Sequence, residues 1–258
     1  HMSLEGTDLD KLALSTEKLL AGTDSKITTI GYYCNPIQYA EHRKTLENVI
    51  CTAGKFGATH VSTFAGAWEG KPVESAYEEF GKVFRELADL AEEKGVKLGI
   101  ENCLMDGTWE HATCNIGFNP KAWEVMFEEV KNDNFGLEWE PTHQMVQLID
   151  PVTELRKWCK KIVHIHGKDA TIDWDAVRHS GISGAVPFVW HRMPGFGDTN
   201  WRDIISILRS NGYEDDICIE GYHDPVYSGE LEMTGQLHAL NYLKWCRGGD
   251  FTPTPWAK

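Results

Sequence analysis

Residues 96–102, with the sequence VKLGIEN, join a short apolar β-like run to a glutamate, Glu101, at its end. Three later stretches repeat this arrangement: FGLEWEPTH (135–143), KIVHIHGKD (161–169) and DICIEG (216–221). A single Glu or Asp carries little information, because such residues are mostly solvated. Parallel strands of a barrel all end on one face, so ligand-type residues at four strand ends predict that these side chains converge on one point.

Short β-like runs alternate with helical patterns along the whole chain, which indicates βαβ units and a parallel sheet. The clearest helix covers 74–94, where apolar residues recur at helical spacing and Gly95 follows as a C-terminal cap. The predicted strands are 27–33, 59–65, 96–101, 135–139, 162–166 and 216–220. The predicted helices are 8–21, 40–57, 74–94, 120–131, 151–160, 200–211 and 230–246.

This alternation predicts an α/β fold of the (β/α)₈ TIM-barrel type in which only six strands are readable, with the first two missing at the N-terminus. The alternatives are an open sheet and a sheet completed by another chain. We expect one N-terminally incomplete barrel domain over residues 3–248, followed by an extended C-terminal tail at 249–258. The long stretches 103–119 and 167–199 are predicted to be loops that wall the pocket.

Composition excludes several classes of function. Of the 258 residues, 41% are apolar, yet no apolar run reaches the roughly 18 residues of a membrane span. The chain has 25 Lys and Arg against 39 Asp and Glu, and the net charge of −14 disfavours nucleic-acid partners. The seven cysteines are scattered without a CxxC motif, which favours a reducing, cytoplasmic location over a disulfide framework.

Strand parity selects among the candidate ligands. His164 and His166 share one face of their strand, and His166 lies nearer the end where a barrel carries its chemistry. Glu138 and Glu140 also share a face, so Glu140 is the predicted ligand and Glu138 the fallback. Together with Glu101 and Glu220, this is a set of three carboxylates and one imidazole. Such a set suits one divalent ion such as Mn²⁺, Mg²⁺, Co²⁺, Zn²⁺ or Fe²⁺.

Four further residues are candidates for substrate binding. His143 lies three residues after Glu140 in a predicted turn, where it either overhangs the site or stabilises the loop. Arg192 precedes the glycine-bearing turn MPGFG and either contacts the substrate or forms a salt bridge at the rim. Lys168 either meets the substrate or forms a structural pair with the residue that follows it. Trp109, in the stretch 103–119, either packs on a sugar face or packs within its own loop.

Five motifs in this order resemble the xylose isomerase-like barrel superfamily, in its sugar-phosphate isomerase/epimerase branch, over residues 27–246. They are IENC (100–103), WEPTH (139–143), HxHxKD (164–169), RMPGFGD (192–198) and IEGYHDP (219–225). Each motif is weak alone, whereas five in order are specific for the superfamily but not for one reaction. The family usually has Asp where this chain has Glu140, so the carboxylate reaches one methylene further.

The resemblance implies an eight-stranded barrel with one divalent metal held by Glu101, Glu140, His166 and Glu220. It implies that His143 and Arg192 contact substrate oxygens, and that in 3-epimerases the two glutamates matching Glu101 and Glu220 also exchange protons with the sugar. Dimers and tetramers are common in this superfamily, so homo-oligomers are expected.

The predicted function is a metal-dependent sugar isomerase or epimerase that moves a proton next to a carbonyl through an enediolate, with a small sugar or sugar-like substrate. The same residues suit a dehydratase or lyase that carries out β-elimination on a keto-sugar, keto-glycoside or keto-polyol. An endonuclease-IV-like nuclease is disfavoured by the charge, and a non-catalytic sugar-binding barrel is the remaining alternative.

Overall fold

The computed structural model describes residues 4–250 and 252–254. The described residues form two compact units, one of residues 4–143 and 161–165 and the other of residues 144–160, 166–250 and 252–254. No helix among the described residues has both the length and the apolar character needed to cross a membrane.

The first unit is built on parallel strands that follow one another in sequence. They are β1 (Thr29–Gly31), β2 (His60–Thr63), β3 (Lys97–Glu101), β4 (Phe135–Trp139) and the first part of β5 (Ile162–Gly167). In this register Glu101 lies opposite Glu138, and Glu138 lies opposite His164. The register therefore sets polar side chains side by side at the carboxyl ends of three strands.

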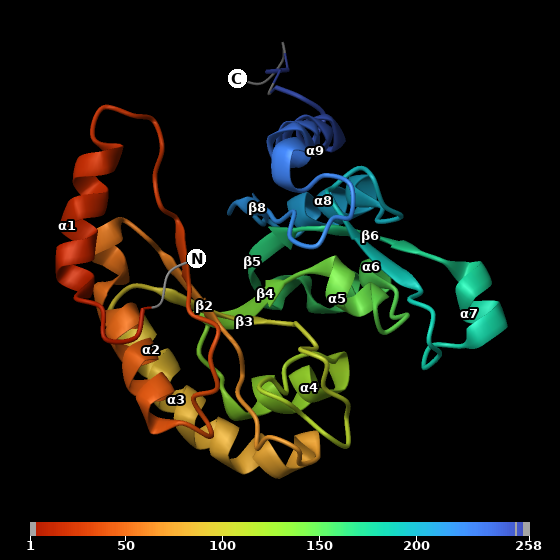
Figure 1. Ribbon diagram of the computed structural model, residues 1–258. Helices are drawn as coiled ribbons and strands as arrows, with labels where there is room; N and C mark the ends of the chain where they lie inside the picture. Colours follow the sequence, from red (N-terminus) through yellow and green to blue (C-terminus); the bar gives the residue numbers. More distant parts are fainter. Residues whose placement is uncertain (1–3, 251, 255–258) are drawn as a thin grey trace. The chain divides into compact units, whose positions relative to one another are not determined.

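Helices connect these strands and pack against their neighbours along the chain (Figure 1). They are α1 (Leu9–Leu20), α2 (Ala40–Thr52), α3 (Tyr77–Glu93), α4 (Pro120–Glu129) and α5 (Pro141–Met145), with 3₁₀ turns at Ala53–Phe56 and Val73–Ala76. The predicted apolar stripe of α3 is buried, including Phe80, Phe84 and Leu87. Gly95 follows α3 with a positive φ of 69°, as expected for a glycine that ends a helix.

The second unit contains the end of β5 and the elements that follow it. They are α6 (Pro151–Trp158), a 3₁₀ turn at Cys159–Lys161, β6 (Asp169–Ile172), α7 (Trp174–Ser180), β7 (Val189–Arg192), α8 (Trp201–Ser210), β8 (Ile217–Ile219), a 3₁₀ turn at Gly229–Leu231 and α9 (Glu232–Cys246). The Glu220 amide donates to the Gly167 carbonyl at 3.0 Å, which joins β8 to the end of β5.

Strand order confirms the predicted α/β fold class. The described residues form a six-stranded sheet in the order β1-β2-β3-β4-β5-β8, and its six strands match the six predicted ones. Consecutive order along a largely parallel sheet is the arrangement of βα barrels. The predicted helices are also present, although several begin or end in the 3₁₀ turns given above.

The prediction that 167–199 is a loop was wrong. This stretch holds β6 and β7, which pair antiparallel as a second, two-stranded sheet, and α7 lies between them. The pairing joins Asp169 to Arg192, and contacts so far apart in sequence leave little local signal. The stretch 103–119 does lack helices and strands apart from one isolated bridge between Asn115 and Gly66.

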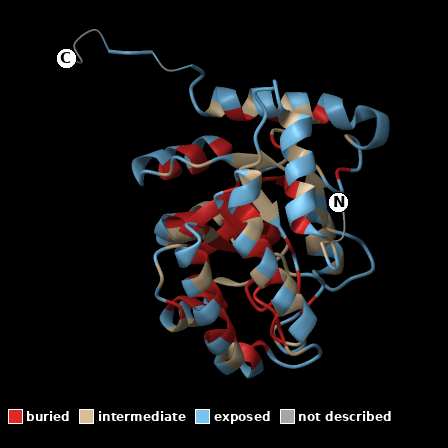
Figure 2. Ribbon diagram, turned by 90° about the vertical axis from the view of Figure 1, so that its left-hand side faces the viewer, coloured by how far each residue is buried: buried red, intermediate tan, exposed pale blue. Residues whose placement is uncertain are grey.

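Burial differs from one strand of the sheet to the next (Figure 2). Strands β2 and β4 are buried along their whole length, whereas β1 and β8, at the two ends of the strand order, are only partly covered. Of the predicted tail 249–258, residues 251 and 255–258 lie outside the described residues, and 252–254 belong to no helix or strand.

Candidate active site

In the first unit, the backbone at Glu101 and the backbone at Glu140 are linked by the side chain of Asn102, which directly follows Glu101. Glu101 is the last residue of β3, and Glu140 directly follows β4. The side chain of buried Asn102 accepts from the Glu140 amide at 2.7 Å and donates to the Glu140 carbonyl at 2.9 Å. This reciprocal pair fixes the ends of the two strands, and with them the two carboxylates, in one register.

A second amide, Asn115, fixes the same strand end from the long loop 103–119. Its side-chain nitrogen donates to the carbonyls of Glu101 at 2.9 Å and Cys103 at 2.8 Å. Its side-chain oxygen accepts from the amides of Ala65 and Gly117, both at 2.9 Å. Sequence reasoning missed Asn115, because its partners come from three separate segments.

The carboxylates of Glu101 and Glu140 are close together and removed from solvent. Each offers an oxygen within 4.8 Å of the other, and the residues are 7% and 0% exposed. Two buried like charges repel each other and lose their hydration, so both remain ionised only if positive charge lies nearby. This half of the predicted ligand set is therefore suited to a cation.

His143 lies beside this pair, on α5 rather than in the predicted turn. Its Nε2 is 3.3 Å from a carboxylate oxygen of Glu140. Burial alone lowers the pKa of His143, but the negative charge of Glu140, with hydrogen bonds to Cys103 and Glu140, holds the pKa well above its usual value. His143 therefore supplies positive charge to the carboxylate pair.

Glu138, the fallback candidate, and His164, on the same face of its strand as His166, have other partners in the first unit. The Tyr33 hydroxyl donates to Glu138 at 2.8 Å, and His164 Nε2 lies 3.8 Å from the other Glu138 oxygen. The second ring nitrogen of His164 is 3.5 Å from the Thr29 hydroxyl. These contacts form a buried polar group one residue layer below the strand ends.

In the second unit, His166 and Glu220 form the other predicted ligand pair. His166 Nδ1 is 3.0 Å from one carboxylate oxygen of Glu220, and Lys168 Nζ donates to the other at 2.7 Å. Lys168 is only 3% exposed, so its charge depends on this carboxylate for compensation. Lys168 thus orients Glu220 toward His166, whether or not it also meets a substrate.

Asp169 organises the turn that follows β7. Its carboxylate accepts from the amides of Ala170, Gly195, Gly197 and Thr199, at distances of 2.9 to 3.3 Å. A Cβ on Gly197 would lie 2.4 Å from an Asp169 oxygen, so only glycine permits this approach. Burial raises the pKa of Asp169, and these hydrogen bonds oppose the rise. Asp169 therefore has a structural role.

Asp224 holds Arg192 in the same unit. It accepts from the Met193 amide at 2.7 Å and from Arg192 Nε at 3.4 Å, and also from the amides of Val226 and Tyr227. Burial raises the pKa of Asp224, but the backbone hydrogen bonds outweigh it and leave the pKa below its usual value. Asp224 is a positioning residue for Arg192.

Trp109 lies in the long loop of the first unit. Its indole nitrogen donates to Glu74 at 2.6 Å, and its ring meets Phe118 edge-on. These contacts account for its place in the loop, and its role in substrate binding stays a prediction.

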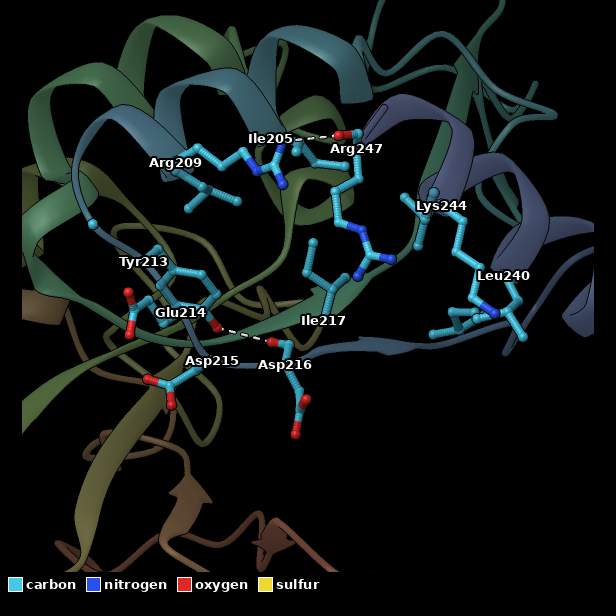
Figure 3. A pocket seen from close by; sticks show the side chains of 14 residues that line it. Ile205, Arg209, Tyr213, Glu214, Asp215, Asp216, Ile217, Leu240, Lys244 and Arg247 are labelled. Atoms are coloured by element: carbon cyan, nitrogen blue, oxygen red, sulfur yellow. Dashed lines mark hydrogen bonds between the residues drawn. The ribbon is translucent and has the colours of Figure 1, made fainter. Parts of the chain in front are cut away.

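A groove of about 740 Å³ opens in the second unit between α8, β8 and α9 (Figure 3). Its apolar wall includes Leu208, Ile217 and Leu240, while Glu214, Asp215, Asp216, Arg209, Lys244 and Arg247 supply charge. None of the predicted site residues lines it. The groove is therefore distinct from the predicted site residues.

The fold agrees with one family of known proteins. A family model described as xylose isomerase-like TIM barrel matches residues 5–244. The chain belongs to this family. Xylose isomerase-like relatives include an inosose dehydratase of Clostridium tetani, 26% identical over 182 residues, which are 69% of this chain and 57% of that protein. The alignment thus spans little more than half of that relative's length.

Solved structures of the family share the fold at low sequence identity. The 3-keto-D-glucoside 4-epimerase of E. coli has a TM-score of 0.68 and 13% identity, with 92% of this chain and 86% of that chain covered. The IolI protein, solved with a bound zinc atom, has a TM-score of 0.64 and 21% identity, with 94% and 81% covered.

Proposed function

We propose that this chain is a divalent-metal-dependent lyase that eliminates water from a keto-polyol of the inosose class. The observation that carries the proposal is the similarity to the inosose dehydratase of Clostridium tetani, which extends over 69% of this chain. The predicted isomerase or epimerase function has weaker support, because the epimerase similarity is one of fold at 13% identity. Dehydratase activity was the stated alternative, and the relatives favour it.

The proposed ligands of the ion are Glu101, Glu140, His166 and Glu220, the four residues at the ends of the predicted strands. The donor set fits, because three carboxylates and an imidazole suit Mn²⁺, Co²⁺, Mg²⁺ or Zn²⁺. The buried pair Glu101 and Glu140 also calls for a compensating cation. When bound, such an ion acts as a Lewis acid on a substrate carbonyl and stabilises the enediolate.

The chain's own residues supply the proton transfers in this proposal. Glu101 or Glu220 takes the proton from the carbon next to the carbonyl, and the electron pair of that C–H bond becomes part of the enediolate. As the carbonyl re-forms, the C–O bond of the hydroxyl on the following carbon breaks. The hydroxyl leaves as water after it accepts a proton, and the product is a conjugated enone.

His143, Arg192, Lys168 and Trp109 are the proposed substrate-binding residues. His143 is suited to donate the departing proton, because burial lowers its pKa but the negative charge of Glu140 raises it well above the usual value. Arg192, held by Asp224, presents a cation to substrate oxygens. Lys168 holds Glu220, so its loss would act on the base as well as on the substrate.

Epimerisation at a carbon next to the carbonyl is the second candidate. It uses the same proton abstraction, but the second glutamate returns a proton to the opposite face and no water leaves. Of the three glutamates in the proposed ligand set, Glu101 and Glu220 match the two that exchange protons with the sugar in 3-epimerases, and this match favours the second candidate.

Proton NMR in D₂O, with an inosose, a 3-keto-glucoside and added Mn²⁺, Co²⁺ or Mg²⁺, separates these reactions. Elimination gives a vinylic product signal, whereas epimerisation exchanges one C–H with no loss of water. The Glu101→Gln variant should lose about 10²–10⁴-fold in rate, while Glu110→Gln, exposed in the adjacent loop, should retain full rate. No reaction with either substrate class and no bound divalent ion in the purified protein would refute both candidates.

A further inference from the structure

The first unit contains a second group of metal-binding side chains that includes a thiol. Glu101, Cys103 and His143 each offer one ligand atom, and these three atoms lie within 4.8 Å of one another. Glu101 and His143 are buried, and Cys103 is half-buried. The four-ligand set proposed for the lyase does not include Cys103 or His143.

We propose that Glu101, Cys103 and His143 form a second metal site, selective for a borderline-soft divalent ion such as Zn²⁺. A thiolate, an imidazole and a carboxylate are the ligands that Zn²⁺ takes in proteins, and three protein ligands leave one position for water. The hard ions Mg²⁺ and Mn²⁺ prefer oxygen, so the sulfur separates this site from the four-ligand set. Glu101 belongs to both sites and bridges them.

The positions of these ligands are fixed before any ion binds. The backbone on both sides of Asn102 is held by the Asn115 side chain, which donates to the carbonyls of Glu101 and Cys103. His143 is set by its place on α5 and by its 3.3 Å contact with Glu140. A site whose ligands are already held in place loses little entropy when it binds its ion.

As a consequence, excess Zn²⁺ bound at this second site would engage the side chains of both Glu101 and His143. In the proposed lyase these residues move protons and contact the substrate, so an ion on Cys103 would inhibit the reaction. The inhibition part of this inference rests on the proposed function, whereas binding of the second ion does not.

Cobalt substitution tests the site without any assay of activity. The Co²⁺-loaded full chain should show thiolate-to-cobalt charge-transfer absorption in the near ultraviolet and bind two equivalents of Co²⁺ or Zn²⁺. In Cys103→Ser the absorption should vanish, one equivalent should remain, and affinity for the second ion should fall more than about tenfold. Cys114→Ser is the matched control, because Cys114 is a half-buried cysteine in the same loop and should leave the spectrum unchanged.

Three outcomes would overturn the inference: no thiolate absorption, absorption that survives in Cys103→Ser, or absorption with only one equivalent bound. The last outcome would make Cys103 a ligand of the single ion instead. A Cys103→Ser protein that binds no ion at all would count against the proposed lyase site, so failures of the two proposals are distinguishable. If the inference holds, excess Zn²⁺ inhibits the wild-type chain more strongly than Cys103→Ser.

Discussion

The helices α3 of the first unit and α9 of the second bury their apolar residues very differently. The apolar residues of α3 lie on one stripe, and Phe80, Phe84 and Leu87 are fully buried there. In α9 the apolar residues are spread around the axis, so only Gly235, Ala239 and Leu243 are buried. Others remain exposed, including Met233, Leu237 and Trp245. An apolar residue contributes to the core only when it shares a face with others.

The two predicted ligand pairs differ in how far the protein compensates their charge. Glu101 and Glu140 of the first unit are buried carboxylates that repel each other, with His143 alone as a nearby cation among the contacts described above. Glu220 of the second unit is already paired with Lys168 and His166. The first pair therefore gains more from a bound cation, whereas the second is largely compensated by the protein itself.

The largest expected effect is a loss of stability when a buried leucine of α3 is truncated, and it tests the difference between α3 and α9. Leu87→Ala in α3 removes a side chain that is 1% exposed and should lower the free energy of unfolding by about 2–5 kcal/mol. Leu237→Ala in α9 is the matched control, because Leu237 is 59% exposed, and it should change stability by less than about 0.5 kcal/mol. Urea unfolding of the two variants measures the free energy of unfolding. Equal losses of stability would contradict the difference between α3 and α9.

The two ligand pairs are compared next, in metal-free protein. Glu220→Gln leaves the buried Lys168 ammonium without its carboxylate and should cost about 1.5–3 kcal/mol of unfolding free energy. Glu140→Gln relieves the repulsion between two buried carboxylates but also removes the carboxylate that faces His143 at 3.3 Å, so metal-free stability should change by less than in Glu220→Gln. Thermal unfolding in EDTA tests both substitutions. A loss of stability in Glu140→Gln as large as in Glu220→Gln would contradict the assigned difference between the pairs.

Asp169 tests how far the turn after β7 depends on the hydrogen bonds of one buried carboxylate. Asp169→Ala deprives the amides of Gly195, Gly197 and Thr199 of their acceptor and should cost about 1–3 kcal/mol. Hydrogen exchange should quicken at residues 193–199 and stay unchanged in α3. Protection that is retained at Gly195 and Gly197 would show that the turn does not need this carboxylate.

The smallest expected effect is a pH dependence carried by Asp224. Its pKa is lower in the folded chain than the usual 3.8, so the unfolded chain takes up a proton first as the pH falls. The stability contribution is therefore complete above pH 3.8 and is lost as the pH falls through the folded pKa. Wild type should exceed Asp224→Asn by about 1 kcal/mol at pH 6, with the gap closing below pH 3.8. A gap that does not change with pH would assign the effect to packing.

Local patterns were sufficient to predict the six strands and the helices between them. The stripe of α3, Gly95 after it and Pro120 at the start of α4 are all signals carried by neighbouring residues. The pattern of polar residues at the carboxyl ends of strands led to the prediction of Glu101, Glu140, His166 and Glu220 as ligands. In βα barrels the active-site residues lie at these strand ends. The hairpin of β6 and β7 escaped prediction, since four-residue strands that pair across a helix have weak local signals.

The sequence by itself determined the fold class and the residue types available for metal binding, because period and strand parity are written into neighbouring positions. Only the tertiary structure decided how those residues are held. Asn102 and Asn115 fix the first pair, Lys168 fixes Glu220, and Asp224 fixes Arg192, through contacts that span 32 to 52 residues except for the shorter span of Asn115. Such contacts form only when the folded backbone brings residues that are far apart in sequence close together in space. Patterns of neighbouring residues do not specify which distant residues will meet.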